Sequence, residues 1–419
     1  MFDSCPAYQN SKPNVLFLSH CVPNPPDKGE KIRAYQEIAF LAGRCRLHLV
    51  CLARNEREVR DAEGLAGRCA SLYVERFSPR AALLRAGGRF ACGGCLNEAF
   101  YSRPRMRQYV AELAKRIPLD ATVAYTTVMM PYAPAAVPIL LDMVDVDSEK
   151  WARYAALRKP GFLYTLEARR LRELEKRCAE AAQFTLLTTE NEAMLLRGIA
   201  PDAAIGHMEN GVDGDFFDGV ARPLTGAQAG RIFVAFVGTM DYHPNAEAAA
   251  WFSVQVFPEL RRRCPELEFF IVGRNPLPAV SKLAGIDGVR VIGSVPDVRP
   301  YLAGARAIVA PLKTARGIQN KVLEGLAMGR RVFASEEVCR TFGAQLPPGV
   351  VRCATVEDYV SELTQTSNAL PASDARIREA ACERFSWTRN APALARRLKC
   401  LDNQPTGPAL CGLDGADRA

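Results

Sequence analysis

The sequence predicts an α/β protein made of two doubly wound, Rossmann-like domains that face a cleft. Its 419 residues are too many for one ordinary hydrophobic core and fit two domains of roughly 200 residues each. Short apolar runs alternate with stretches of helical periodicity in both halves, which is typical of parallel sheets covered by helices. A segment of small and polar residues separates the two halves.

Six apolar runs in the first half predict the buried strands of one parallel sheet. They are residues 14–19, 47–52, 71–74, 121–125, 138–141 and 184–188. A proline-rich loop follows the first run, and Ile32, Tyr35 and Ile38 then recur at helical spacing. We interpret residues 201–211 as the exit from this domain, because an Asn-Gly turn signal lies at their end.

The second half repeats the strand-helix alternation more regularly. Its predicted strands are residues 232–237, 268–272, 289–292, 307–310 and 331–334, and its predicted helices are 244–263, 276–284, 297–304, 318–328, 355–369 and 373–397. We interpret the small and polar residues 218–230 as the linker. The predicted domains are therefore 1–217 and 231–401, followed by a flexible tail over 402–419.

Charge and composition exclude several classes of protein. The net charge of +8 is spread along the chain, so the basic clustering expected of a nucleic-acid-binding protein is missing. No apolar run reaches the ~18 residues that a spanning helix needs. The first residues carry neither the basic nor the apolar region of a secretory signal, and the 14 cysteines are scattered. We therefore expect a cytoplasmic protein with reduced thiols.

The most specific motif is found at residues 316–332, directly after a predicted strand. Gly317 allows the backbone to approach a ligand closely, and the helix predicted to begin near Ile318 offers free N–H groups to an anion. Lys321 adds a positive charge for a phosphate. Glu324 lies one turn later, where its carboxylate can accept two hydrogen bonds from a ribose diol. The alternative is a helix with ordinary surface lysine and glutamate residues.

This segment resembles the donor-site signature of glycosyltransferase family 4, the large retaining family of the two-Rossmann GT-B class. The family pattern has two glutamates separated by seven residues, and Glu324 matches the second, which binds the ribose in the family. Arg316 occupies the place of the first glutamate, which contacts the donor sugar. The resemblance implies that Arg316 and the backbone of Gly317 and Ile318 face the sugar here.

A second stretch, residues 236–245, predicts a strand, a glycine turn and a helix start that suit a diphosphate. The family pattern has arginine and lysine after this glycine, and both are missing here. We therefore expect Gly238 and Thr239 to assist the diphosphate through the loop and the helix N-terminus. Arg274 and Lys321 are predicted to neutralise its charge. A plain loop arginine is the alternative for Arg274.

Two further glycine-bearing loops follow predicted strands. Gly293 lies in a loop that touches the nucleotide base in the family, and an ordinary turn is the alternative. Gly29 and Arg33 lie within residues 27–33, where family members have a loop that faces the diphosphate and the acceptor. An exposed charged helix start is the alternative for these two residues.

Three aspartates, Asp142, Asp145 and Asp147, follow the strand predicted at 138–141. Many family members have a histidine near this place that contacts the donor sugar, and Asp145 is the nearest fit by spacing. Asp145 can orient sugar hydroxyls or act as a base toward the acceptor. The alternatives are helix capping by Asp147 or Ser148, or a metal site, although the two-Rossmann class normally needs no metal.

The combined motifs resemble the sugar transferases that accompany exosortase and PEP-CTERM exopolysaccharide systems in bacteria, over about residues 14–395. This resemblance implies retaining transfer of a sugar from a nucleotide-diphosphate donor to a saccharide or polyprenyl-linked acceptor, with no cofactor and no metal. The predicted catalytic residues are Asp145, Arg274 and Lys321, and the predicted donor-binding residues are Gly29, Arg33, Gly238, Thr239, Gly293, Arg316, Gly317, Ile318 and Glu324.

Two alternative functions stay open, a sugar-nucleotide epimerase and a non-catalytic partner of a polysaccharide assembly complex. A nicotinamide dehydrogenase is disfavoured because no GxGxxG follows the first strand of either half. Between residues 76 and 106, arginines alternate with aromatic and aliphatic residues, which suits docking at a membrane interface. An amphipathic helix packed on the sheet is the alternative, so peripheral contact with the inner membrane face is a hypothesis.

Overall fold

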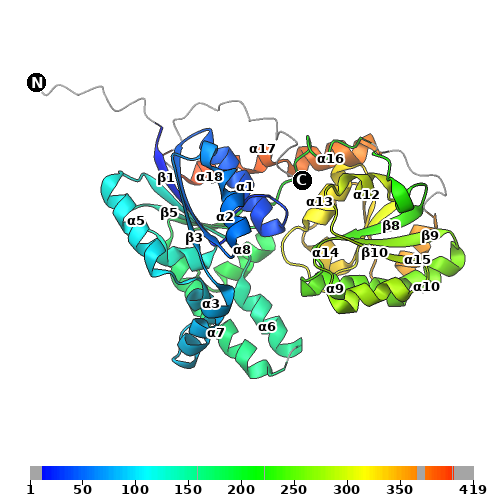
Figure 1. Ribbon diagram of the computed structural model, residues 1–419, viewed down its shortest axis with the longest axis horizontal. Coiled ribbons are helices and arrows are strands. Elements are labelled where there is room, and N and C mark those ends of the chain that lie inside the picture. The colour runs from blue at the N-terminus through cyan, green and yellow to red at the C-terminus, as the bar shows by residue number, and fades with distance from the viewer. Residues whose placement is uncertain (1–11, 158, 221, 366–372, 399, 401–419) are drawn as a thin grey trace, which may run out of the picture. The chain divides into compact units, whose positions relative to one another are not determined.

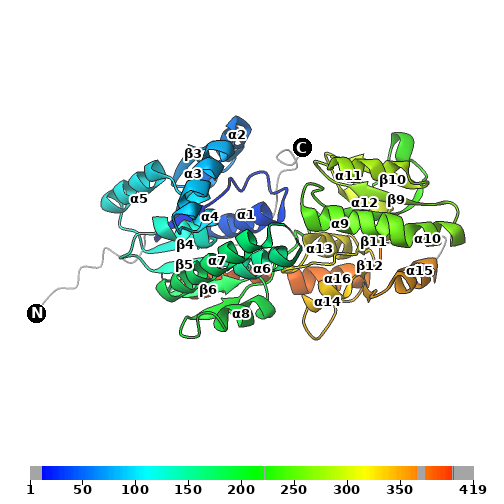
Figure 2. The same ribbon diagram turned by 90° about the horizontal axis from the view of Figure 1, so that it is seen from below.

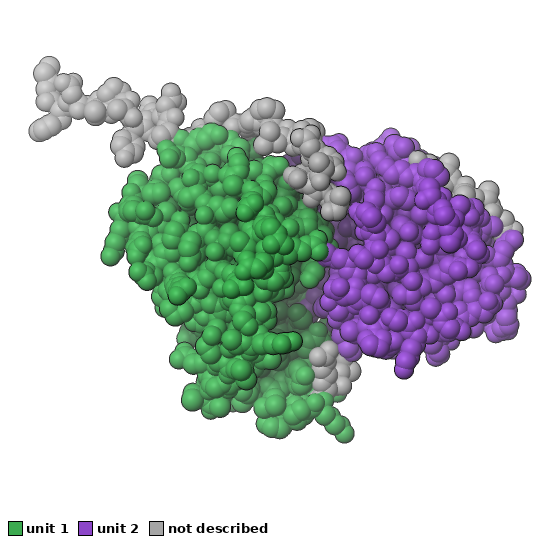
Figure 3. All heavy atoms as spheres, in the orientation of Figure 1, with its two compact units in different colours: residues 1–208, 391–410 green, residues 209–390, 411–419 purple. Residues whose placement is uncertain are grey.

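The computed structural model describes residues 12–157, 159–220, 222–365, 373–398 and 400. These residues form two compact units, shown in two colours in Figure 3. Unit 1 contains the described residues up to Met208 together with those from Ala391 onward. Unit 2 runs from Glu209 to Asn390. Each unit has a parallel sheet of its own, which confirms the prediction of two Rossmann-like domains.

The sheet of unit 1 has the strand order β3-β2-β1-β4-β5-β6-β7. Its strands are β1 (Asn14–Ser19), β2 (Arg46–Ala53), β3 (Ser71–Arg76), β4 (Ala121–Tyr125), β5 (Ile139–Val144), β6 (Phe184–Leu187) and β7 (Ile205–His207). The first six coincide with the predicted apolar runs. The short strand β7 lies where we predicted only an exit segment, because the three residues Ile205–His207 include a single apolar side chain and so form no apolar run.

Helices pack on both faces of this sheet (Figures 1 and 2). They are α1 (Gly29–Ala42), α2 (Glu56–Glu63), α3 (Pro79–Ala91), α4 (Leu96–Tyr101), α5 (Pro104–Arg116), α6 (Asp147–Leu157), α7 (Gly161–Ala181), α8 (Glu190–Arg197) and α18 (Pro392–Arg397), with the 3-10 turns η1 (Ala66–Arg68) and η2 (Thr127–Tyr132). The central strands β1 and β4 are buried over nearly their whole length. Continuous apolar strands of this kind need cover on both faces.

The sheet of unit 2 has the order β10-β9-β8-β11-β12-β13. Its strands are β8 (Ile232–Val237), β9 (Leu267–Val272), β10 (Val289–Gly293), β11 (Ala307–Ala310), β12 (Val332–Ala334) and β13 (Val350–Arg352). Of these, β13 was missing from our prediction, and it too has only three residues. Phe233 of β8 stacks on Phe270 of β9 with ring centroids 4.1 Å apart, in a core rich in phenylalanine.

Most helices of unit 2 lie within the predicted ranges, but the short helix Glu336–Arg340 was not predicted, and the range 373–397 is divided into three helices. The helices of this unit are α9 (His243–Trp251), α10 (Phe257–Arg263), α11 (Pro278–Ser281), α12 (Arg299–Gly304), α13 (Asn320–Ala327), α14 (Glu336–Arg340), α15 (Val356–Gln365), α16 (Ala375–Phe385) and α17 (Trp387–Asn390), with the short turns η3 (Gly226–Gln228), η4 (Phe252–Val256) and η5 (Lys282–Gly285). The helix predicted over 244–263 is a single run in which the π turn η4 joins α9 to α10. No helix among the described residues is both long and apolar enough to cross a membrane.

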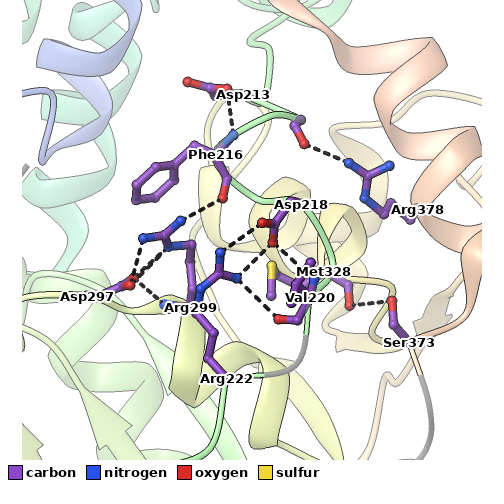
Figure 4. A network of polar contacts seen from close by, with 11 residues as sticks. Asp213, Phe216, Asp218, Val220, Arg222, Asp297, Arg299, Met328, Ser373 and Arg378 are labelled. Carbon is purple, nitrogen blue, oxygen red and sulfur yellow. Dashed lines mark hydrogen bonds and ion pairs between the residues drawn. The ribbon is translucent and has the colours of Figure 1, made fainter. Parts of the chain in front are cut away.

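The segment that we predicted as a linker belongs, in its described part, to unit 2. Figure 4 shows how polar contacts hold the chain here. Asp218 accepts two hydrogen bonds of 2.8 Å from Arg222, and Arg378 donates to the carbonyl of Gly214 at 2.7 Å. The first contact lies within the segment and the second holds the chain just before it, so the described part of the segment continues unit 2 and does not stand apart from it.

The chain passes from unit 1 to unit 2 after Met208 and returns after Asn390. We predicted one passage, across residues 218–230, so the structure places the first boundary earlier and adds a second. The return explains why α18 packs with unit 1, where Arg397 lies over the ring of Phe184 at 4.0 Å. The predicted tail, residues 402–419, lies outside the described residues.

Both sheets have the same topological switch point. The chain first builds outward on one side of the first strand and then crosses to the other side, so the switch lies between β1 and β4 in unit 1. In unit 2 it lies between β8 and β11. Ligands of open α/β sheets bind at the carboxyl ends of the strands beside such a point. These two edges are therefore the places to look for a functional site.

Candidate active site

Three loops of unit 2 are joined edge to edge at the carboxyl ends of its strands. The N–H of Gly238 donates to the carbonyl of Val272 at 3.0 Å, and the N–H of Met240 donates to the carbonyl of Arg274 at 2.8 Å. Hydrogen bonds thus bind the loop after β8 to the loop after β9. This arrangement brings the predicted residues Gly238, Thr239 and Arg274 together at one edge.

Gly273 makes this close approach possible. It has φ +153°, and a Cβ atom added there would lie 1.7 Å from the carbonyl oxygen of Gly238. Its N–H donates to the carbonyl of Gly293 at 2.8 Å, which adds the loop after β10 to the row. Gly293 has φ +79° with open space around its Cα. A flat ligand can therefore approach this backbone without meeting a side chain from Gly293.

Among the predicted cations of unit 2, Lys321 is buried, whereas Arg274 and Arg316 are half-buried. Its side chain is on α13, its residue is 8% exposed, and its Nζ donates to Oδ1 of Asn245 at 2.6 Å. The ammonium group also lies 5.0 Å from the centre of the Phe236 ring. Burial lowers the pKa of Lys321 to about 8, although the charge of Glu324 opposes this shift. A buried ammonium group with a lowered pKa is poised to gain from an anion.

Asn245 holds Lys321 in place, and sequence reasoning did not select it. The side-chain amide of Asn245 donates to the carbonyl of Thr239 at 2.9 Å, so one residue links the loop after β8 to Lys321. A Cβ atom on Gly238 would come within 2.7 Å of this amide nitrogen. The glycine therefore makes room for Asn245, and the position of Asn245 inside the motif at 236–245 was the available signal.

The loop after β11 is folded by Gln319. Its amide donates to the carbonyls of Arg316 and Gly317 at 3.0 and 3.3 Å. Gly317 has φ +60°, Ile318 is buried, and Arg316 is half-buried. The helix begins at Asn320 and not near Ile318 as predicted, because Gln319, at the N-cap position, still has an extended backbone. The free N–H groups therefore belong to the turn that contains Lys321.

Glu324 lies one turn after Lys321 on α13 and is half-buried. Its charge acts on the ammonium group of Lys321, so the two side chains are near neighbours as predicted from their spacing. In unit 2 the predicted residues thus lie at the carboxyl edge of the sheet, although Gly293 ends the outermost strand β10, two strands away from β8. Their individual roles stay predictions.

In unit 1, Gly29 and Arg33 have very different environments. Gly29 is the exposed first residue of α1. Arg33 is 1% exposed, and its Nε donates to Asp142 at 2.6 Å while its Nη1 donates to the carbonyl of Met208 at 2.7 Å. These contacts give Arg33 a structural role, because they hold Met208, where the chain leaves unit 1 for unit 2, against the sheet. A donor contact from Arg33 stays a prediction.

The three predicted aspartates, one within β5 and two after it, each make different contacts. Asp142 is fully buried in its pair with Arg33, and Asp145 accepts a hydrogen bond of 2.7 Å from the hydroxyl of Thr188. Asp147 starts α6, with Lys150 3.6 Å away. In the described part of the chain, no three His, Cys, Asp or Glu side chains are grouped to hold a metal ion.

His20 is the residue of unit 1 that sequence reasoning missed. It directly follows β1, and its two ring nitrogens lie 3.6 Å from a carboxylate oxygen of Glu30 and 3.4 Å from the hydroxyl of Thr126. Burial would raise the pKa of Glu30, but the hydrogen bond and charge of His20 lower it to about 2. His20 therefore bridges the switch point between β1 and β4. Its place directly after a predicted strand was the available signal.

Among the residues that the structure describes, three that are not glycine have a left-handed backbone, and all lie where strands end. Thr126 (φ 74°) follows β4, Val144 (φ 70°) ends β5, and Asn275 (φ 54°) follows β9. Such conformations cost roughly 1–3 kcal/mol each and gather at functional sites. They mark the same two edges that the switch points indicate.

Comparison with known proteins agrees with this architecture. Residues 231–365 match the family model of glycosyl transferases group 1. The sucrose-phosphate synthase of Thermosynechococcus elongatus is similar in structure, with a TM-score of 0.66, 14% identity, and coverage of 92% of this chain and 98% of that one. Anabaena HepE in complex with UDP and glucose has a TM-score of 0.64 and 11% identity, and the match covers 93% of this chain and 100% of that one. TarM has a TM-score of 0.64 and 10% identity, and the match covers 93% of this chain and 99% of that one. No curated protein sequence matches the chain.

These similarities confirm the predicted GT-B fold of two Rossmann-like domains. The family match in unit 2 and the fold together support a glycosyltransferase. The matched segment contains the whole row of loops from Gly238 to Glu324 described above. Membership of family 4 and the association with exosortase systems stay predictions.

Proposed function

We propose that the protein is a retaining glycosyltransferase that moves a sugar from a nucleotide-diphosphate donor to a saccharide or lipid-linked acceptor in exopolysaccharide synthesis. The cluster of Lys321 with Asn245, beside Glu324 and Gly238, is the observation that carries this proposal. It joins a buried cation, a carboxylate and a glycine loop at one strand edge. One similar structure, Anabaena HepE, is described in complex with UDP-glucose, which supports a donor of this kind.

In this proposal the donor diphosphate meets the backbone of Gly238 and Thr239, with the ammonium group of Lys321 beside it. Arg274, whose carbonyl is fixed by Met240, adds a second positive charge. Glu324 accepts hydrogen bonds from the ribose hydroxyls, and Gly293 leaves its backbone open to the base. Arg316, Gly317 and Ile318 face the sugar.

The proposed chemistry needs few side chains. The bond between the anomeric carbon and the diphosphate oxygen breaks while the acceptor oxygen bonds to the same face of that carbon. The acceptor proton passes to the departing phosphate oxygen, so no separate base is required. Lys321 stabilises the charge that develops on the leaving group, and Asp145 orients hydroxyl groups of the sugar or the acceptor. The protein acts mainly by positioning and electrostatics.

A transfer assay with a panel of nucleotide sugars and cell-envelope glycan fractions tests this proposal. We expect release of nucleoside diphosphate that depends on acceptor, and an NMR spectrum in which the product keeps the anomeric configuration of the donor. Conversion of the nucleotide sugar to an epimer without acceptor would favour the epimerase. Nucleotide binding without turnover under every condition would favour the non-catalytic partner.

We further propose peripheral contact between α3 and the cytoplasmic face of the membrane. Leu83 and Leu84 are 57% and 80% exposed, and α3 carries Arg80, Arg85 and Arg89, all exposed, with no acidic residue. The surface is narrower than the predicted stretch from 76 to 106. The aromatic residues Phe77, Phe100 and Tyr101 contact one another inside unit 1.

Helix α7 extends this surface. Figures 1 and 2 place α3 and α7 on the same side of unit 1, and Arg170 of α7 donates to the carbonyl of Phe90 in α3 at 2.7 Å. Phe162, in the first turn of α7, is 68% exposed. Apolar side chains beside arginines suit an anionic lipid interface.

The double change Arg85→Glu/Arg89→Glu is expected to lower the affinity for phosphatidylglycerol vesicles, measured by co-sedimentation, by more than 10-fold, since each basic residue near such a surface contributes about 1 kcal/mol. Leu84→Asp is expected to lower this affinity as well. The matched control, Lys115→Glu/Arg116→Glu, changes the charge equally at the exposed end of α5. Equal binding by all four proteins would contradict membrane contact through α3.

A further inference from the structure

A cavity of about 790 Å³ lies in unit 1 among residues to which the proposed donor site gives no role. Four arginines line it, with one glutamate as the only acidic residue of its wall, and these residues are Arg54, Arg57, Arg76, Arg80 and Glu56. Such an excess of positive charge around one hollow raises the local concentration of anions. The cavity therefore has the character of an anion site.

The fold brings these arginines together from two neighbouring strand ends. Arg54 directly follows β2 and Arg76 is the last residue of β3, beside Ala53 in the register of the sheet. Arg57 and Arg80 lie in the first turns of α2 and α3. Both helices thus begin at the cavity wall, and their positive dipole ends add to the charge of the four guanidinium groups.

The existing contacts balance part of this charge. The backbone N–H of Arg54 donates to the carboxylate of Glu58 at 2.7 Å, and the charges of Glu30 and Glu58 act on the Arg54 guanidinium group. Arg76 pairs with Glu56 at 2.6 Å, and Arg57 lies 3.9 Å from Asp61. Across the part of the chain that the structure describes, Arg80 is exposed and forms no ion pair or side-chain hydrogen bond. Surface arginines with solubility roles alone are usually spread apart, whereas these four converge on one hollow.

We propose that this cavity binds a phosphate or diphosphate ester carried by the acceptor, an inference that rests on the proposed transfer reaction. Guanidinium groups bind phosphate oxygens in a planar, bidentate manner, which makes arginine the residue of choice for such a group. The donor diphosphate is already assigned to the strand edge of unit 2. The arginine cavity is a second, separate anion site on the other sheet.

The cavity adjoins the switch point of unit 1. Nη2 of Arg54 lies 3.5 Å from the hydroxyl of Tyr101, and the Tyr101 ring contacts His20 edge-on, with centroids 5.4 Å apart. A phosphate held by Arg54 therefore lies one residue away from His20. The saccharide part of the same molecule would extend along this edge toward the strand ends where His20 and Thr126 lie.

Hydrogen exchange measured by mass spectrometry on the full chain tests the site without knowledge of the acceptor. We expect millimolar pyrophosphate to protect peptides over residues 54–63 and 76–91 in the wild-type protein and in the control Arg116→Glu. Arg116 ends α5, ahead of β4 and so at the opposite edge of the sheet. The double variant Arg57→Glu/Arg80→Glu is expected to lose this protection, with affinity reduced at least 10-fold.

Failure of this inference can be told apart from failure of the proposed function. Protection of unit 2 peptides by nucleoside diphosphates reports on the donor site, whereas peptides 54–63 and 76–91 report on the arginine cavity. Absent protection of these two peptides, or protection that persists in the double variant, would overturn the inference. Protection by phosphatidylglycerol vesicles but not by pyrophosphate would assign the cavity to membrane headgroups and overturn the acceptor assignment.

Discussion

Replacement of Lys321 by alanine is expected to lower the rate of sugar transfer by about 10²–10³-fold, the usual effect of losing one group that stabilises charge in a transition state. The ammonium group is buried, is held by Asn245 at 2.6 Å, and lies beside the loop of Gly238 that the diphosphate is proposed to meet. In such a site a charge acts at short range with little screening by water. The measurement is the initial rate of acceptor-dependent release of nucleoside diphosphate.

Titration of Lys321 should also make the transfer rate depend on pH. Burial lowers the pKa of Lys321 from the ordinary 10.5 to about 8, so the free protein loses the positive charge as the pH rises past about 8. We expect kcat/KM of the wild-type enzyme to fall on the alkaline side of this value, and the fall to be missing in Lys321→Ala. A bound diphosphate favours the charged form, so kcat should hold to higher pH than kcat/KM.

Stability should change with pH in the opposite direction. Between about pH 8 and 10.5 the unfolded chain still binds the proton of Lys321 while the folded chain has released it. The free energy of unfolding therefore gains a positive contribution as the pH rises through this window. Chemical denaturation of the wild type and of Lys321→Ala at pH 7 and pH 9.5 measures that contribution.

Lys282→Ala is the matched control for Lys321→Ala, because Lys282 is exposed in the turn η5 that precedes β10. It should keep the rate and the pH profile of the wild type. An alkaline fall that persists unchanged in Lys321→Ala would show that another group titrates. A wild-type rate in Lys321→Ala would remove Lys321 from the donor site.

The strands could be predicted from the sequence because most of them are apolar runs of four to eight residues, the pattern that a sheet covered on both faces requires. The short strands β7 and β13 could not, since pairing with a neighbour and not periodicity defines them. Helix α1 shows another limit. Its buried face includes Arg33 and Glu37, which periodicity assigns to solvent. Arg33 is held by Asp142 and by the carbonyl of Met208, both distant in sequence, and Glu37 lies 3.4 Å from Arg33.

Candidate site residues could be predicted where charged side chains belong to one continuous motif that directly follows a strand. Lys321 and Glu324 were selected in this way, because the carboxyl ends of parallel strands meet at one edge, and their roles stay predictions. Residues that converge from separate motifs were missed. Asn245 matters because it meets Lys321 in space, and the arginine cavity exists only because β2 and β3 are neighbours.

The change Glu324→Ala is expected to weaken binding of the cognate nucleoside diphosphate by about 10²-fold, since hydrogen bonds to a charged group contribute roughly 1.5–3 kcal/mol each and a ribose diol offers two. Glu324 is half-buried on α13, one turn from Lys321, and its charge acts on the ammonium group of that residue. The measurement is a thermal-shift titration with UDP, GDP and ADP. One of them should raise the melting temperature of the wild type and have little effect on the variant.

Glu324→Ala also removes a negative charge beside Lys321. The rise in melting temperature with nucleotide could therefore be lost because the ribose loses its hydrogen bonds, or because Lys321 loses its positive charge at lower pH. The charge of Glu324 raises the pKa of Lys321, so its removal should move the alkaline fall in affinity to lower pH. Glu266→Ala is the control, because Glu266 is exposed in the turn ahead of β9, at the opposite edge of the sheet. A nucleotide shift equal in wild type, Glu266→Ala and Glu324→Ala would show that the ribose does not bind Glu324. A shift lost in Glu324→Ala alone would place the ribose there.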